Sequence, residues 1–371
     1  MLWSLALLLI SRAMLISLAP AAEAHKRPHF HDDHVAGYYW HSETRDPPFY
    51  EISPNIYLDM WARSDSWQYL DIAEKGYYLE PRPGGYGTVA CFPLYPLLIR
   101  VVSTVLRGHS LVVAIMISAI AAWSASVLLY QLVESWKGAA AARIATLGLF
   151  SFPSAFFLTT VFPHSLFLAL CLASFMAADR GRFLLAGIVA AVAGATRAEG
   201  FVLIPALAAA YWQQHRFRVN REILGLVFAP MGLAAYMTYL GWRFGDPLAF
   251  VAIHEQFGRT PTNPIITLLR PIWDHMFNVR HFLTYLAGAW LIVASVARSP
   301  RPALVFGWLL FLFPLATGQY ESIYRVQLTT FPVYLGLAAA RPRWLAWLQI
   351  VVFAFLQAFM CFWFIAGVRL N

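Results

Sequence analysis

The chain contains few charged residues. Asp, Glu, Lys and Arg make up 12% of its 371 residues, about half the share found in soluble domains. So few charges cannot cover the surface of a water-soluble protein of this length, which excludes a soluble enzyme and a disordered chain. The three cysteines, Cys91, Cys171 and Cys361, do not form the pattern of a disulfide scaffold, because the last two stand inside apolar runs.

Apolar sequence dominates instead: 60% of the residues are hydrophobic, in runs of about 20 that recur along the whole length. Such runs predict an all-α polytopic membrane protein rather than a β-barrel. The whole chain, 1–371, is then a single membrane-embedded domain. We expect about eleven spans, near 2–22, 109–133, 141–157, 162–178, 183–196, 200–212, 223–242, 282–297, 303–318, 326–340 and 344–367.

The first apolar run has two interpretations. Ala22-Glu-Ala24 resembles the cleavage site of a signal peptide, but no basic residue precedes the run and Arg12 interrupts it. We expect a retained first transmembrane helix, with a cleaved signal peptide as the alternative.

A large polar loop follows. Residues 25–92 are aromatic, rich in Pro and Gly, and carry about half of the acidic residues. Residues 93–107 are apolar but short, with Arg100 in the middle, and they predict an amphipathic helix at the membrane interface. We therefore interpret 25–108 as one loop that contains an interfacial helix.

The distribution of Lys and Arg predicts the orientation. Short loops rich in these residues are expected in the cytoplasm, which places the 25–108 loop and the active site on the extracytoplasmic side. The same distribution accounts for the net charge of +8, so no nucleic-acid partner is expected. The basic loops lie near 137–143, 179–182, 215–221, 298–301 and 341–343.

Two carboxylates of the outer loop, Asp65 and Asp71, are candidates for catalysis. They lie in the stretch Trp61–Glu80, before a Gly-Tyr turn, and the apolar segment Cys91–Arg100 (CFPLYPLLIR) follows. A carboxylate in an aromatic pocket at a membrane surface can serve as a general base, because partial loss of water makes it more basic. The alternative is a solvated loop acid that caps a helix.

These segments resemble the GPI mannosyltransferase II (PIG-V) family and its prokaryotic relatives, which belong to the GT-C class of membrane glycosyltransferases. The stretch SDSWQYLDIAEKGYYLE, from Ser64, and CFPLYPLLIR match its first block. Two positions depart from the family pattern: Ser64 stands where Trp is usual, and His164 stands where Glu is common. Further matches follow in order at 162–167, 180–187, 195–205, 245–250 and 324–332.

The resemblance implies a GT-C-like bundle that transfers a sugar, with inversion, from a polyprenyl- or dolichyl-phosphate donor to an acceptor hydroxyl. The acidic residue of the first large loop, Asp65, is then the general base, and Asp71 is the reserve. Only the resemblance implies that the sugar is mannose. We expect no cofactor and no catalytic metal, although the His-rich tract His25–His34 offers imidazoles and carboxylates to a divalent ion.

The lipid phosphate of such a donor needs a cation near the interface. Arg325 follows Tyr324 at the outer end of a predicted span, and Arg197 lies beside Glu199 in an outer turn. An arginine there can donate two parallel hydrogen bonds to a phosphate. The alternatives are contact with lipid headgroups for Arg325 and a structural ion pair with Glu199 for Arg197. The remaining predicted substrate-binding residues are His164, Asp71 and Arg100.

A rival function is a transporter or flippase of lipid-linked sugars. Such a protein should contain internal repeats and charged or broken helices at mid-membrane, and the sequence contains no convincing repeat. A non-catalytic scaffold subunit is a third interpretation. The expected partners are the lipid-linked donor and membrane lipids. We expect the plasma membrane of a prokaryote, or otherwise the endoplasmic reticulum membrane, and the acceptor stays undefined.

Overall fold

The computed structural model describes residues 2–25, 52–79, 87–216, 218–256, 260–273, 278–318 and 323–366, which form helices joined by turns, with no strand among them. The predicted all-α architecture is therefore confirmed. Within these residues, five helical segments are long and apolar enough to cross a membrane, and five further apolar helices are shorter. The predicted count of about eleven spans is not confirmed.

The membrane-length segments are Leu2–Ala24 (α1, Leu2–Ile16, and α2, Ala19–Ala24), α6 (Ser110–Lys137), Arg221–Phe244 (η4, α11 and α12), α15 (Val279–Val296) and α19 (Arg343–Ile365). The shorter apolar helices are α5 (Leu94–Leu106), α7 (Ala139–Ser151), α8 (His164–Asp179), α9 (Phe183–Gly194) and α16 (Arg301–Ala316). The other α-helices are α3 (Ile56–Asp59), α4 (Ser66–Lys75), α10 (Leu203–His215), α11 (Leu224–Phe228), α12 (Met231–Phe244), α13 (Ala249–Gln256), α14 (Pro264–Trp273), α17 (Ile323–Thr329) and α18 (Pro332–Ala339). Short 3-10 helices are η1 (Thr88–Ala90), η2 (Ala155–Leu158), η3 (Ala198–Val202) and η4 (Arg221–Ile223).

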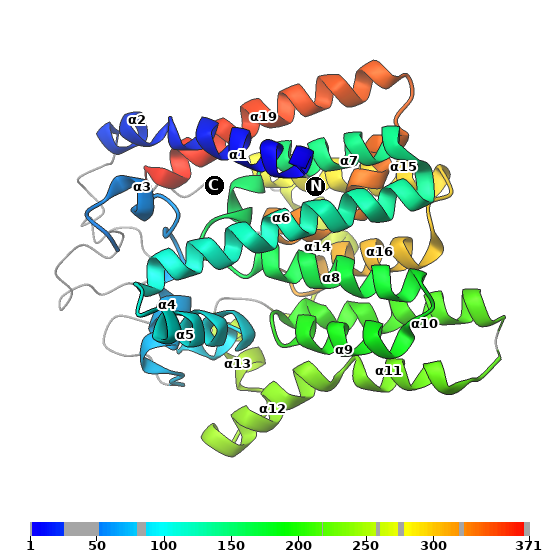
Figure 1. The fold of residues 1–371 in the computed structure, drawn as a ribbon, viewed down its shortest axis with the longest axis horizontal. Helices are drawn as coiled ribbons and strands as arrows, with labels where there is room; N and C mark the ends of the chain where they lie inside the picture. The colour runs from blue at the N-terminus through cyan, green and yellow to red at the C-terminus, as the bar shows by residue number, and fades with distance from the viewer. Residues whose placement is uncertain are drawn as a thin grey trace.

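The helices α6, α8 and α9 lie side by side in the middle of the molecule (Figure 1). α6 packs against α7 and α8, and α8 packs against α9. The helices α3, α4 and α5 gather at one end of this bundle, and the end of α10 and the start of α11 lie at the other (Figure 1). The described part of the predicted outer loop and the described part of the basic loop near 215–221 are thus at opposite ends. Which end faces the cytoplasm stays a prediction.

The predicted span at 141–157 is interrupted, because α7 ends and the chain turns through η2 before α8 begins. Arg12, the charge within α1, lies buried against this break. Its Nη1 donates to the carbonyl oxygens of Ala155 (3.1 Å) and Phe156 (3.4 Å) and to Thr159 Oγ1 (2.9 Å). A charge inside an apolar helix is costly unless such partners satisfy it. Arg12 therefore ties α1 to the segment that connects α7 and α8.

The predicted span at 326–340 is also interrupted. α17 stops at Thr329, and α18 starts at Pro332. Proline has no N–H to donate, so Pro332 cannot continue the hydrogen bonds of α17 but fits the first turn of α18. The interruption separates α17, which carries Tyr324 and Arg325, from the rest of the apolar run.

Close contacts between glycines fix α9. A Cβ atom at Gly187 would lie 1.8 Å from the carbonyl oxygen of Gly225, and a Cβ atom at Gly225 would lie 2.0 Å from that of Phe183. Small residues let membrane helices approach this closely, and the packing that results is a main source of helix association in lipid. α9 in turn leads into the turn that carries Arg197.

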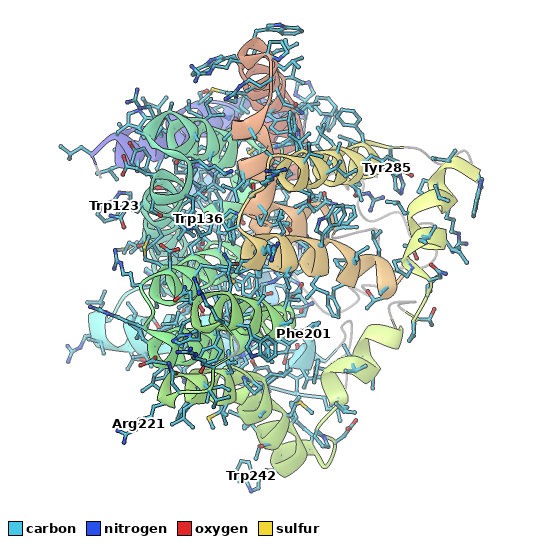
Figure 2. The ribbon with its side chains drawn as sticks, turned by 90° about the vertical axis from the view of Figure 1, so that its right-hand side faces the viewer. Trp123, Trp136, Phe201, Arg221, Trp242 and Tyr285 are labelled. Atoms are coloured by element: carbon cyan, nitrogen blue, oxygen red, sulfur yellow. The ribbon has the colours of Figure 1, made fainter. Side chains whose placement is uncertain are left out.

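Large apolar side chains also face outward. On α5, Ile99 is buried while Leu97, Val101 and Val105 are each at least half exposed. Trp242 projects from α12 (Figure 2) and is 80% exposed. Surfaces of this kind are stable against lipid, so they agree with the predicted membrane location. The helix predicted at 93–107 is present as α5, and its place at the interface stays a prediction.

Candidate active site

Asp65 occupies the N-cap position of α4, but its side chain makes no capping hydrogen bond to that helix. Ser64, directly before it, has φ +58°, in the left-handed region that residues other than glycine rarely adopt. Such a conformation persists only where the surroundings hold it, and it is often found at functional sites. The carboxylate points instead toward α17.

Arg325 of α17 meets this carboxylate. Its Nη1 donates to Asp65 Oδ2 at 3.0 Å, a contact between residues 260 positions apart. The Asp65 side chain is 44% exposed and that of Arg325 13%. The guanidinium carbon lies 5.4 Å from the ring centroid of Phe157 and 5.3 Å from that of Phe162. These rings attract the cation, so Arg325 is held in place while the carboxylate remains accessible.

A second polar group is centred on Arg197, in the turn between α9 and η3. Its Nε and Nη2 donate to the two carboxylate oxygens of Glu199, at 3.2 and 2.6 Å. Its Nη1 lies 2.9 Å from Nε2 of His164, the first residue of α8. All three nitrogen atoms of Arg197 therefore have protein partners. The structure contains the ion pair with Glu199 that the sequence offered as the alternative to phosphate binding.

The two polar groups border the same aromatic rings. The ring of His164 lies 5.8 Å from that of Phe157 and 5.4 Å from that of Phe162, between centroids. These are the two rings beneath Arg325. Residues from the first loop, from the start of α8, from the turn after α9 and from α17 thus form one site.

Backbone hydrogen bonds hold the supporting segments together. The N–H of Val161, just before α8, donates to the carbonyl oxygen of Trp61 at 2.9 Å. The N–H of Leu94, at the start of α5, donates to the carbonyl oxygen of Ala195 at 3.0 Å. Both segments of the outer loop are therefore tied to the helix ends that carry the site.

Both arginines remain charged despite their burial. Burial alone lowers the pKa of Arg325, but the neighbouring Asp65 and Tyr324 reverse this effect and raise the pKa above its usual value. The same balance holds for Arg197, whose pKa Glu199 raises above its usual value against the effect of burial. Each cation thus has an acidic partner that stabilises it.

Cys91 lies near the site but is not a nucleophile. Burial raises the pKa of its thiol to about 12, and the charge of Asp65 adds to the effect. The thiol donates to Gln68 Oε1 at 3.0 Å. A neutral, buried thiol is unreactive. Burial also raises the pKa of Tyr69. Its ring packs edge-on against that of Phe162, with 5.8 Å between centroids, beside Phe157.

The remaining predicted residues differ in whether they contact this site. Tyr324 adjoins it, with its ring 6.0 Å from that of Phe157. Asp71 forms an ion pair with Lys75 at 2.6 Å, on the same helix. The side chain of Arg100 is exposed on α5, and no contact within the described residues connects it to the site.

The described residues contain no group of three or more His, Cys, Asp and Glu side chains that could hold a metal ion. The His-rich tract lies outside the described residues, apart from His25 at its start.

Sequence reasoning missed the ion pair between Asp59 and Arg63. Arg63 Nη2 lies 2.6 Å from Asp59 Oδ2, and both side chains are 2% exposed. The two residues stand only four positions apart in the sequence, where the chain turns between α3 and α4. The aromatic floor of Phe157 and Phe162 was missed as well, since single aromatic residues in apolar runs carry no distinct pattern.

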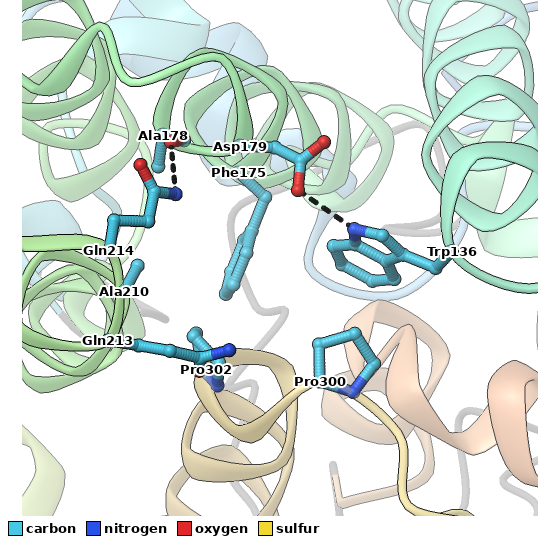
Figure 3. A pocket seen from close by; sticks show the side chains of 9 residues that line it. All are labelled: Trp136, Phe175, Ala178, Asp179, Ala210, Gln213, Gln214, Pro300 and Pro302. Carbon is cyan, nitrogen blue, oxygen red and sulfur yellow. Dashed lines mark hydrogen bonds between the residues drawn. The ribbon is translucent and has the colours of Figure 1, made fainter.

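A cavity of about 70 Å³ lies at the other end of α8 (Figure 3). Trp136 Nε1 donates to Asp179 Oδ1 at 2.9 Å, and Gln214 Nε2 donates to the carbonyl oxygen of Ala178 at 2.8 Å. Small-molecule sites typically measure about 300–1,000 Å³. This cavity is too small for a sugar, and α8, with 16 residues, separates it from His164 by roughly 22 Å.

Comparison with known proteins yields the fold. The structure is similar to that of ArnT from Cupriavidus metallidurans bound to undecaprenyl phosphate, with a TM-score of 0.53 and 19% identity over 80% of this chain. It is also similar to an oligosaccharyltransferase from Archaeoglobus fulgidus in complex with Zn and sulfate, with a TM-score of 0.51 and 13% identity over 98% of this chain. The chain has a GT-C-like fold.

These similarities extend to the fold alone. The chain spans 59% of the length of ArnT and 53% of that of the oligosaccharyltransferase. No protein-family model matches the chain. No curated protein matches it either. The PIG-V resemblance of the sequence is therefore not shown by these comparisons.

Proposed function

We propose that this chain is an integral-membrane glycosyltransferase that transfers a sugar from a polyprenyl- or dolichyl-phosphate donor to an acceptor hydroxyl. The observation that carries the proposal is the contact of Asp65 with Arg325 over an aromatic floor. The reaction needs a carboxylate that accepts a proton and a cation that holds a phosphate. Here the two groups meet from distant parts of the chain.

In the proposed reaction Asp65 accepts the proton of the acceptor hydroxyl. The hydroxyl oxygen attacks the anomeric carbon, the bond from that carbon to the phosphate oxygen breaks, and the configuration inverts. The electron pair leaves with the lipid phosphate, which Arg325 stabilises through charge-assisted hydrogen bonds. The phosphate is already a good leaving group, so no second carboxylate is required as a general acid.

The observed ion pair then represents the form without donor. A phosphate that reaches Arg325 competes with Asp65 for the guanidinium, because both are anionic oxygen ligands of the same cation. Donor binding therefore frees the carboxylate that the acceptor needs. Productive order follows from this competition: the donor binds first and the acceptor second.

The fold supports the proposed donor class, since the similar ArnT structure holds undecaprenyl phosphate. The identity of the sugar as mannose and membership of the PIG-V-like family rest on the sequence resemblance. We place the site on the extracytoplasmic face of a prokaryotic plasma membrane, from the distribution of Lys and Arg.

The test is sugar transfer by the purified full-length chain in detergent, with a labelled polyprenyl-phosphate mannose donor and lipid acceptors. Asp65→Asn should reduce turnover by about 10²–10⁴-fold, the usual contribution of a general base. Glu74→Gln, at an exposed position of α4, is the matched control and should retain activity within a few-fold. Full activity of Asp65→Asn would exclude this residue as the base. A transporter would form no glycosylated acceptor in this assay, because transport involves no covalent transfer of the sugar.

A further inference from the structure

His164 has a buried ring nitrogen, Nδ1, to which the proposed reaction assigns no role. The residue is 2% exposed, and its Nδ1 atom has no hydrogen-bond partner within the described residues. Buried polar atoms in proteins are nearly always paired, so each exception calls for an explanation. A site that is completed by its substrate is one such explanation.

The hydrogen bond at Nε2, the other ring nitrogen of His164, determines which nitrogen carries the proton. A guanidinium can only donate hydrogen bonds, so His164 Nε2 accepts from Arg197 Nη1. The imidazole is then neutral, with its proton on Nδ1. Glu199 holds Arg197 through two hydrogen bonds and so keeps the donor aimed at the ring. Glu199, Arg197 and His164 form a chain that ends in an unpaired N–H.

The surroundings indicate what this N–H meets. His164 and Arg325 border the same two aromatic rings, and Arg197 adds a second cation to the neighbourhood. An anionic oxygen gains from both positive charges and from the N–H donor, whereas a sugar hydroxyl gains only a neutral hydrogen bond.

We propose that Nδ1–H of His164 is a second hydrogen-bond donor to the phosphate of the lipid donor, beside Arg325. Arg197 and Glu199 are positioning residues that hold the imidazole in this tautomer and do not themselves contact the phosphate. The inference rests on the proposed function, because it assumes a lipid phosphate at Arg325. It assigns a role to His164, one of the two positions at which this chain departs from the family pattern.

The test measures binding of undecaprenyl phosphate to the full-length chain in detergent, with undecaprenol as the ligand without phosphate. In His164→Gln the amide oxygen can still accept from Arg197, but the donor at the Nδ1 position is lost. In His164→Asn the amide N–H lies near the Nδ1 position. We expect His164→Gln to weaken undecaprenyl phosphate binding about tenfold or more. His164→Asn should stay within about threefold of the natural chain, and undecaprenol binding should not change.

Unchanged affinity of His164→Gln for undecaprenyl phosphate would overturn the inference and leave the proposed function standing. If the natural chain itself binds undecaprenyl phosphate no better than undecaprenol, the proposed donor class is wrong and the inference falls with it. Should His164→Gln fail to fold, ¹⁵N NMR of the imidazole in the natural chain replaces it. A protonated Nδ1 that shifts on addition of undecaprenyl phosphate supports the inference, and an unprotonated or unresponsive Nδ1 overturns it.

Discussion

Asp59 and Asp65 stand six residues apart in the first loop, and each meets an arginine, yet the two ion pairs differ in nearly every physical respect. Asp59, at the end of α3, pairs with Arg63 four residues further on, at 2.6 Å, with both side chains 2% exposed. Its Oδ1 also accepts from the backbone N–H groups of Ile52 and Ser53, at 2.7 and 3.1 Å. The Asp59 carboxylate is thus enclosed by local partners.

Asp65 is the opposite case. Its partner Arg325 comes from 260 residues further along the chain, the hydrogen bond is 3.0 Å long, and the carboxylate is 44% exposed. An enclosed carboxylate stabilises a loop, because its removal leaves a buried charge alone. An accessible one contributes little to stability and can exchange its partner for a substrate. Burial and partner distance, rather than residue type, separate the structural acid from the candidate catalyst.

The largest expected effect on stability comes from Asp59→Ala. This change leaves the guanidinium of Arg63 buried without its nearest carboxylate, which typically costs about 3–5 kcal/mol. Asp65→Asn should cost no more than about 1 kcal/mol, since its ion pair is partly exposed. Denaturant unfolding of both variants in detergent measures the difference. Equal losses of stability would remove the distinction between the two carboxylates.

A second test concerns the arginine partners. Arg325→Met should raise the KM for the lipid donor by about 10–100-fold, because the phosphate loses charge-assisted hydrogen bonds. The donor KM of Arg325→Lys should lie between those of the natural chain and Arg325→Met, since lysine retains the charge but lacks the planar guanidinium that donates two parallel hydrogen bonds. The matched variant Arg63→Lys should lower the free energy of unfolding and leave the donor KM unchanged. Steady-state kinetics at varied donor concentration measure the KM of each variant. An unchanged donor KM in Arg325→Met would contradict the role of Arg325 in phosphate binding.

The smallest effect is expected at Ser64. Glycine adopts a φ of +58° without steric cost, so Ser64→Gly should raise the free energy of unfolding by up to about 1 kcal/mol. Glu74→Gly, in the exposed part of α4, is the control and should lower it by about 1 kcal/mol. Thermal unfolding of the two variants provides the measurement. A loss of stability in Ser64→Gly would mean that the serine side chain, not the backbone conformation, matters at this position.

Part of this picture was predictable from the sequence. Apolar runs predicted the helices, and the resemblance selected Asp65. The need for a cation beside the lipid phosphate selected Arg197 and Arg325, and the structure brings these residues into one site with His164. The pairing of Asp65 with Arg325 was not predictable, because nothing in a single sequence connects positions 260 residues apart. Hydropathy likewise cannot show that apolar runs break, since turns such as η2 are as apolar as the helices beside them.

Two features nevertheless had a local indication in the sequence. Pro332 marks the start of α18 within the run predicted as one span. The charge of Arg12 in α1 marked a need for partners, and those partners are the oxygen atoms of the α7–α8 connection. Both features were visible as residue types, but their partners depend on how the helices pack.

The glycine contacts of α9 have a consequence for how such proteins diverge over time. A lipid-facing side chain can be exchanged for another apolar one without moving the helices. A methyl group at Gly232 would instead come within 1.7 Å of the carbonyl oxygen of Ala191, and one at Gly225 would meet that of Phe183 at 2.0 Å. Distant relatives should therefore keep small residues where α9 contacts α11 and α12, even after most residues on the bundle surface have changed.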